Sequence, residues 1–229
     1  MARRKPGDAI EKLIADTLAM EAEEAQEAGT LGFMARALVQ ATLPHKRVTG
    51  PEFTRRNGAY TLTLLAPSHI GLPYGTVPRI LLAWMTTEAV RTQSRELVLG
   101  DSLSKFMREL ELVPTGGRWG TVGRLKDQSR RLFASTISAS YADAEKFAET
   151  GYRLADKSML WWDSKSADQA GLWQSTVTLT EGFYREVTEH PIPVDLRAIR
   201  ALKRSPMALD IYCWLTYRAS YAKRDSTIP

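Results

Sequence analysis

The sequence predicts an α+β fold that is rich in helices, with a basic helix near its centre. Apolar residues recur at helical spacing in most segments, which is typical of helices with one buried face. Over residues 59–65, apolar and polar residues alternate strictly, which is typical of a strand. Gly116 and Gly117 predict a turn, and the pattern after it predicts a helix over residues 118–133.

The helix expected over residues 118–133 has two faces of different chemistry. At about 100° per residue, one face is expected to lie against the core. It collects Val122, Leu125, Ser129, Leu132 and Phe133. The opposite face collects Gly120, Gly123, Arg124, Asp127 and Arg131, and its flanks carry Arg118, Lys126 and Arg130. Five basic residues against one acidic residue make this helix strongly positive.

Two glycines on the outward face indicate that something approaches the helix closely. A glycine costs a helix roughly 1 kcal/mol relative to alanine, so its presence needs a reason. A basic helix that follows a glycine turn is typical of a recognition helix in the major groove of DNA. The alternative interpretation is an ordinary solvated helix with a basic face.

The composition is that of a soluble globular protein. The chain has 229 residues, of which 44% are hydrophobic and 25% charged, enough for one large domain or two small ones. A net charge of +5 and a pI of about 9.3 favour a nucleic-acid partner without requiring one. The start of the chain does not resemble a signal peptide, and no apolar run approaches the roughly 18 residues of a membrane span. We therefore expect a cytoplasmic protein that makes no membrane contact.

The first 43 residues predict a basic arm and two helices. Residues 1–7 are expected to form the arm. A helix over residues 8–28 carries seven acidic side chains and only Lys12, so its polar face is a poor surface for DNA. A second helix is expected over residues 30–43. We expect this N-terminal part to pack on the body of the protein or on a second subunit.

The middle of the chain predicts alternating helices and strands. After the strand at 59–65, a helix capped by Thr76 is expected over 77–92, then a strand at 96–99 and a helix at 102–112. The inward residues of the last helix are expected to be Leu103, Phe106, Met107 and Leu110. Strand candidates follow the basic helix at 134–141, 158–162 and 173–179. This is the order of a winged helix, in which a hairpin after the recognition helix forms the wing.

The last 50 residues predict a second helical unit. A short helix is expected at 180–189, and the prolines of residues 190–193 predict an extended connector. Asp195 is expected to start a helix that ends near residue 204, and another helix is expected over 207–221. The interpretation is the first helices of a second, incomplete winged-helix module.

Enzymatic and metal chemistry find no support in the residue pattern. The three histidines, His45, His69 and His190, have no metal-ligand spacing, and Cys213 is the only cysteine. The phosphate-binding loop and dinucleotide fingerprints are also missing. Trp161 and Trp162 could stack on bases, although packing is the simpler interpretation. We therefore expect no catalytic residue, no bound metal and no cofactor.

Several short segments together resemble one known family, the plasmid-encoded RepA replication initiators. The resemblance begins near residue 56, and residues 1–55 match no known pattern. The matching segments are residues 56–58, 71–75, 82–84, 87–89, 116–120, 131–133, 191–195, 201–206, 208–210 and 214–218.

The resemblance implies a protein that binds repeated sites, or iterons, at a plasmid origin and so controls copy number. It also implies that the protein opens the adjacent duplex and recruits the host helicase or initiator. Such initiators commonly carry two winged-helix modules, and some repress their own gene as dimers and bind iterons as monomers. We divide the chain into an N-terminal dimerising part (1–55), a winged-helix domain (56–180) and the start of a second one (181–229). Because a second recognition helix and wing are missing, we expect a truncated initiator.

The basic helix supplies the residues expected to contact DNA. Base edges and nearby phosphates are assigned to Arg118, Thr121, Arg124, Asp127, Gln128 and Arg131, and phosphates alone to Lys126 and Arg130. Two alternatives stay open. One is a winged-helix transcriptional repressor, and the other is a dimerising or structural module of a larger DNA-binding protein.

Overall fold

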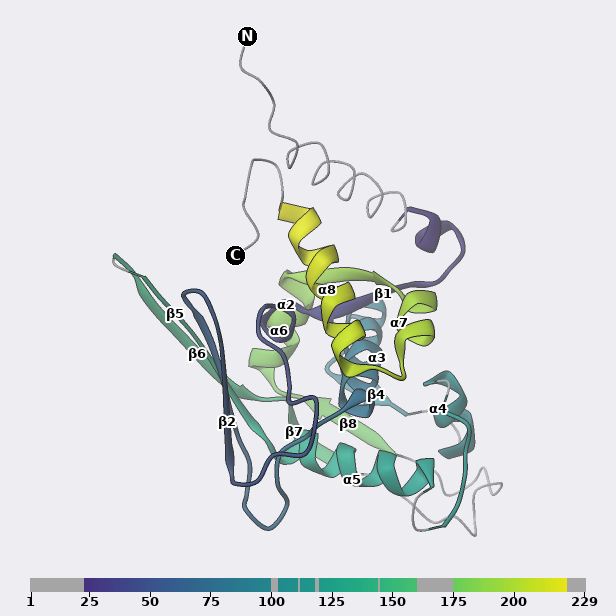
Figure 1. Cartoon of the computed structure of the whole chain (residues 1–229). Helices are drawn as coiled ribbons and strands as arrows, with labels where there is room; N and C mark the ends of the chain where they lie inside the picture. The colour runs from purple at the N-terminus through teal and green to yellow at the C-terminus, as the bar shows by residue number, and fades with distance from the viewer. Residues whose placement is uncertain are drawn as a thin grey trace.

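The long helix α3 (Thr76–Thr92) runs through the middle of the molecule (Figure 1). It contacts one strand from the start of the described chain, the strand that follows it, and three later helices. The computed structural model describes residues 23–99, 103–110, 112–117, 120–143, 145–159 and 175–221. Helices and antiparallel sheets alternate along this part of the chain, so the predicted α+β class is confirmed. No helix of the described residues has the length and apolar character that a membrane crossing requires.

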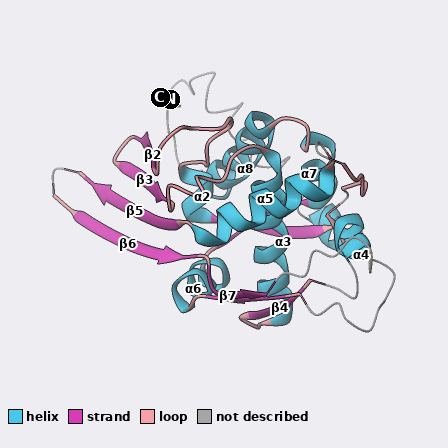
Figure 2. Ribbon diagram, turned by 90° about the horizontal axis from the view of Figure 1, so that it is seen from below, coloured by secondary structure: helices cyan, strands magenta, loops and turns pink. Residues whose placement is uncertain are grey.

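Three antiparallel sheets bring distant parts of the sequence together (Figure 2). The first pairs β1 (Leu31–Ala35) with β9 (Pro191–Asp195). The second has the order β2 (Glu52–Asn57), β3 (Tyr60–Leu65), β5 (Thr136–Ala142) and β6 (Phe147–Arg153). The third has the order β4 (Glu96–Val98), β8 (Thr176–Leu179) and β7 (Ala155–Met159).

The helices lie largely where the apolar periodicity predicts them. They are α2 (Arg36–Gln40), α3, α4 (Leu103–Glu109), α5 (Thr121–Ala134), α6 (Glu181–Glu189), α7 (Leu196–Leu202) and α8 (Pro206–Tyr221). All four inward residues predicted for α4 are buried. Asp195 caps α7 as predicted, because its carboxylate accepts a hydrogen bond from the backbone N–H of Arg197. Thr76 does not cap α3, which begins after Gly75 without a side-chain cap.

The prediction of a helix over residues 30–43 is wrong, because the first half of this segment is the strand β1. Each residue of β1 pairs with one of β9, from Leu31 opposite Asp195 to Ala35 opposite Pro191. A side chain at Gly32 would lie 2.4 Å from Leu196, so glycine lets β1 approach α7. A pairing across some 160 residues therefore overrides local helix propensity, and only α2 remains helical.

The expected connector at 190–193 is part of a strand, and two further strands were not predicted. The connector lies largely within β9, whose partner β1 is distant in the sequence. The unpredicted strands β2 and β6 form the edges of the second sheet and are mostly exposed, so they lack apolar alternation. Residues 8–22, Trp161, Trp162 and the predicted loop between β7 and β8 lie outside the described residues.

The buried side chains form one cluster that crosses both predicted domain boundaries. Leu38 and Val39 of α2, Leu81 of α3, and Val187 and Leu209 of the C-terminal helices all belong to it. The sheet of β1 and β9 likewise joins the N-terminal part to the C-terminal part. The assignment of the three parts to separate modules stays a prediction.

A buried ion pair ties three segments together inside this cluster. The guanidinium of Arg79 on α3 is 4% exposed and donates two hydrogen bonds to the carboxylate of Asp210 on α8, at 2.7 and 2.8 Å. Its other donors reach the carbonyl oxygens of Leu43, at 2.7 Å, and of Gly75, at 2.6 Å. The imidazole of His45 lies 2.6 Å from the same carboxylate. Arg79 thus joins α3, α8 and the chain that leaves α2.

We predict that Arg79→Met destabilises the protein by about 3–5 kcal/mol, because it leaves the Asp210 carboxylate and two carbonyl oxygens without their main donor. The free energy of unfolding in urea measures this change. Arg91→Met is the matched control, since Arg91 pairs with Glu88 but its side chain is 67% exposed. That change should cost less than about 1 kcal/mol. Equal costs for the two variants would contradict the role given to Arg79.

Candidate nucleic-acid interface

The basic helix α5 begins at Thr121, later than the sequence predicts. Gly120 is its N-cap and has an extended backbone. The backbone N–H of Thr121 donates to the hydroxyl of Thr115 at 3.0 Å, and the N–H of Thr115 donates to the Thr121 hydroxyl at 2.9 Å. The glycine turn between them, with Gly117 at φ +84°, folds back to allow this exchange. The turn therefore satisfies the first donors of α5, and Arg118 lies outside the described residues.

The two glycines expected on the outward face have different roles. Gly120 is buried, and a side chain there would lie 2.2 Å from the carbonyl oxygen of Thr115 and 2.5 Å from that of Gly116. The expectation that Gly120 faces outward is therefore wrong, since the turn requires a glycine at this position. Gly123 is exposed, and a side chain there would meet no atom within 4 Å.

The core face of α5 is confirmed. Leu125 and Leu132 are fully buried, Ser129 is 2% exposed and Phe133 5%. Val122 is partly buried and packs against the same cluster. This face fixes which side of α5 points outward.

Gln128 and Arg131 hold α5 to the turn at residues 71–75. Gln128 is 5% exposed, and its amide oxygen accepts a hydrogen bond of 2.9 Å from the backbone N–H of Tyr74. The Arg131 side chain is 12% exposed, lies over the Tyr74 ring at 5.6 Å and donates to Asp127 at 2.8 Å. The turn covers this side of the helix. The expectation that Arg131 faces outward is therefore wrong, and Gln128 is equally covered.

Three cations remain on the outward side of α5. Arg124, Lys126 and Arg130 are exposed, and none of their side chains makes a hydrogen bond or an ion pair with a described residue. The only acidic residue of the helix, Asp127, is already paired with Arg131. In the view from below, α5 lies across the front of the molecule (Figure 2). The outward side of α5 is thus a positive surface beside the bare backbone of Gly123, which suits a polyanion.

The thiol of Cys213 is buried in the core. Burial raises the pKa of the Cys213 thiol to about 12, so it stays protonated. No group of three His, Cys, Asp or Glu residues within the described ranges could hold a metal ion.

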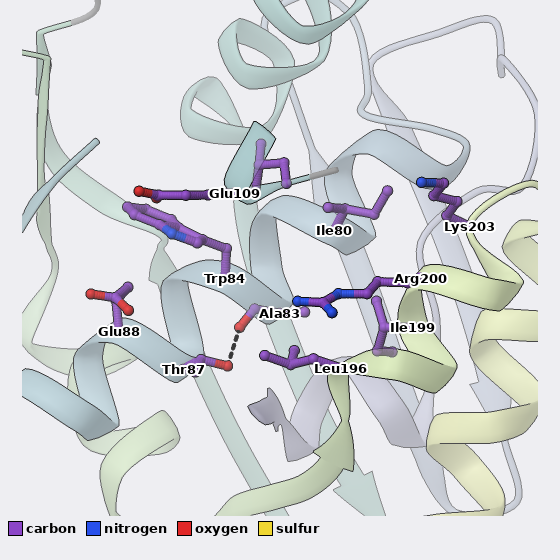
Figure 3. Close-up of a pocket in the computed structure, with 11 residues that line it drawn as sticks. Ile80, Ala83, Trp84, Thr87, Glu88, Glu109, Leu196, Ile199, Arg200 and Lys203 are labelled. Atoms are coloured by element: carbon purple, nitrogen blue, oxygen red, sulfur yellow. Dashed lines mark hydrogen bonds between the residues drawn. The ribbon is translucent and has the colours of Figure 1, made fainter. Parts of the chain in front are cut away.

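A pocket of about 110 Å³ lies where α7 packs against α3 and the end of α4 (Figure 3). Trp84 and Leu196 are among its apolar lining residues, and Glu88 and Arg200 stand at its sides. Its lining comes from α3, α4, α7 and their ends, so it is separate from the surface of α5.

Comparison with known proteins identifies the family of the chain. Residues 72–227 match the family described as plasmid-encoded RepA protein, which is most of the chain. The chain therefore belongs to the family of plasmid-encoded RepA replication initiators, and the resemblance found in the sequence is confirmed. The matched range includes the whole of α5. Among curated proteins, none matches the chain.

Two solved structures resemble the fold. A crystal structure of domains 2 and 3 of RctB has 10% sequence identity and a TM-score of 0.50, and covers 82% of this chain and 70% of that one. A second structure of the same two domains has 10% identity and a TM-score of 0.48, and covers 80% and 68%. At this identity the first likeness supports a shared fold only.

We predict opposite effects of alanine at the two glycines of α5. Gly120→Ala should destabilise the protein by about 1–3 kcal/mol, because the methyl group would collide with two backbone carbonyls. Gly123→Ala should leave stability unchanged or raise it by up to about 1 kcal/mol, since it only favours the helix. Urea unfolding of both variants measures the contrast. A loss of stability for Gly123→Ala matching that of Gly120→Ala would contradict the two positions described.

Proposed function

We propose that this chain binds double-stranded DNA at a plasmid origin, with the outward side of α5 in the major groove. The proposal is carried by three exposed cations that have no ion partner among the described residues, and that lie beside Gly123. They are Arg124, Lys126 and Arg130. Side chains on one helix face can reach both base edges and phosphates when the helix enters the groove. The missing side chain of Gly123 would let the DNA approach the helix backbone.

The eight residues predicted to contact DNA take different roles in this proposal. Arg124 reads a base edge, and Lys126 and Arg130 bind phosphates. Gln128 and Arg131 act as positioning residues, because their side chains hold the turn at residues 71–75. Thr121 positions the start of the helix, and Asp127 orients Arg131. Arg118 stays a predicted contact at the turn.

The strand pairing supports a winged-helix arrangement around α5. β4 precedes α4 and α5, whereas β7 and β8 follow them, and the three strands form one sheet. The strands of this sheet therefore flank the two helices along the sequence. β5 and β6 join the other sheet with β2 and β3. In this proposal the wing is therefore the β7–β8 hairpin and not the hairpin directly after α5.

Family membership supports a role at the origin of replication. We propose that the protein binds iterons, helps to open the adjacent duplex, contacts the host helicase or initiator, and thereby sets plasmid copy number. It acts in the cytoplasm by binding alone, without catalysis, metal or cofactor. Footprinting on the parent plasmid tests this role: protected repeats at the origin support it, whereas a lone promoter palindrome would point to a repressor.

We predict that two kinds of α5 variant lose DNA affinity in different ways. Arg124→Ala should cost on the order of 1–3 kcal/mol on the true site and much less on random DNA, because a guanidinium can pair with guanine O6 and N7. Lys126→Ala and Arg130→Ala should weaken binding to the true site and to random DNA equally. Each should also lower the slope of log affinity against log salt by about 0.9. Fluorescence anisotropy over a salt series measures both effects.

Gly123 provides a steric test of the same surface. Gly123→Leu should abolish binding with little change in folding, because the bulky side chain would hold α5 out of the groove. Gly123→Ala is the matched control and should keep most of the affinity. Full affinity of the leucine variant would contradict the proposed docking of α5.

The acidic N-terminal segment should serve self-association. We propose a dimer formed through the acidic segment at residues 8–28. Its seven acidic side chains disfavour contact with DNA. Removing residues 1–22 should lower the mass measured by light scattering and leave the salt slope unchanged. This deletion keeps β1 and α2, whose residues Ala35 and Leu38 lie in the core. A sharply lower salt slope would instead make the basic arm a phosphate contact.

A further inference from the structure

The loop between α2 and β2 carries two more exposed cations. Lys46 and Arg47 are exposed, and neither makes a hydrogen bond or an ion pair with a described residue. No acidic residue occurs between Pro44 and Pro51, so the loop is purely basic. Exposed basic loops are common on protein surfaces. This loop differs because hydrogen bonds hold both of its ends in place.

Both ends of this loop are fixed to the interior. At the start, the buried guanidinium of Arg79 donates to the carbonyl oxygen of Pro44 at 3.3 Å, and the backbone N–H of Gly75 donates to the same oxygen at 3.1 Å. The next residue, His45, bonds the Asp210 carboxylate. At the far end, the N–H of Ala66 donates to the carbonyl oxygen of Pro51 at 2.8 Å. These hydrogen bonds form a frame that orders the loop carrying Lys46 and Arg47.

The same contacts connect the base of the loop to α5. Pro44 bonds Gly75, and the neighbouring Tyr74 bonds Gln128 of α5. A short chain of hydrogen bonds thus runs from the base of the loop to the middle of the helix. In Figure 1 the loop descends from α2 toward the end of α5 that leads into β5. The loop and α5 each carry cations that have no ion partner in the described part of the chain, and these hydrogen bonds connect the two groups.

We propose that Lys46 and Arg47 form a second phosphate-contact site for the same DNA duplex that α5 binds. The inference rests on the proposed function of α5. The phosphates of a duplex repeat along both strands, so a cation fixed beside a helix in the major groove meets the backbone that borders the groove. Because the frame already orders the loop, binding costs less conformational entropy than it would for a free loop. Arg79 is the positioning residue of this site.

The test uses the full chain and measures affinity for origin DNA and for random DNA over a range of salt concentrations. Lys46→Ala and Arg47→Ala should each lower the slope of log affinity against log salt by about 0.9, and the double variant by about 1.8. Both DNAs should lose affinity equally, because phosphates carry no sequence information. Thermal unfolding should be unchanged, since both side chains are exposed.

Arg185→Ala is the control with the same change in net charge. Arg185 lies on α6, is 65% exposed and pairs with Glu189, so its loss should leave the salt slope unchanged. If Arg185→Ala changed the salt slope as much as Lys46→Ala or Arg47→Ala, net charge alone would explain the effect. That result would overturn the site.

The variants also separate this inference from the proposed function. If Arg124→Ala weakens binding but Lys46→Ala and Arg47→Ala do not, the loop site is overturned and the role of α5 stands. If the parent protein binds no DNA at low salt, both are overturned. A loss confined to origin DNA would make the loop a base reader and would likewise overturn its assignment to phosphate.

Discussion

The contact between Arg79 and Asp210 determines where the other parts of the molecule lie. A guanidinium on the central helix α3 can satisfy its donors only if α8, the segment after α2 and the turn before α3 all converge on it. The pair is largely buried, so removing either partner would leave a charge without compensation. This constraint joins the two ends of the described chain and fixes the basic loop at residues 44–50.

The turn at residues 71–75 connects the Arg79 ion pair to α5. Tyr74 bonds Gln128 and lies under Arg131, and these two side chains are thereby withdrawn from solvent. The Thr115 and Thr121 pair fixes the start of the helix in the same way. The polar residues of α5 thus divide into those that hold the helix and those that are left to face outward.

The proposed interface combines a few residues from two separate parts of the chain. Its cations come from α5 and from a loop more than 70 residues earlier, and neither group has an ion partner among the described residues. If both contact one duplex, much of the binding energy comes from phosphates and depends strongly on salt. Specificity would then depend on Arg124 and on any base contacts from the proposed wing and the turn.

The sequence by itself determined the α+β class, most helices and the core face of α5, because apolar periodicity and caps are local signals. Its short matching segments also indicated the family. Only the tertiary structure decided that residues 31–35 form a strand, since the partner of β1 lies near residue 193. It also decided which polar residues of α5 are free. Periodicity places Arg124 and Arg131 on the same side, but it cannot show that the turn at residues 71–75 covers one of them. Helical spacing describes a helix alone, whereas exposure depends on what packs against it.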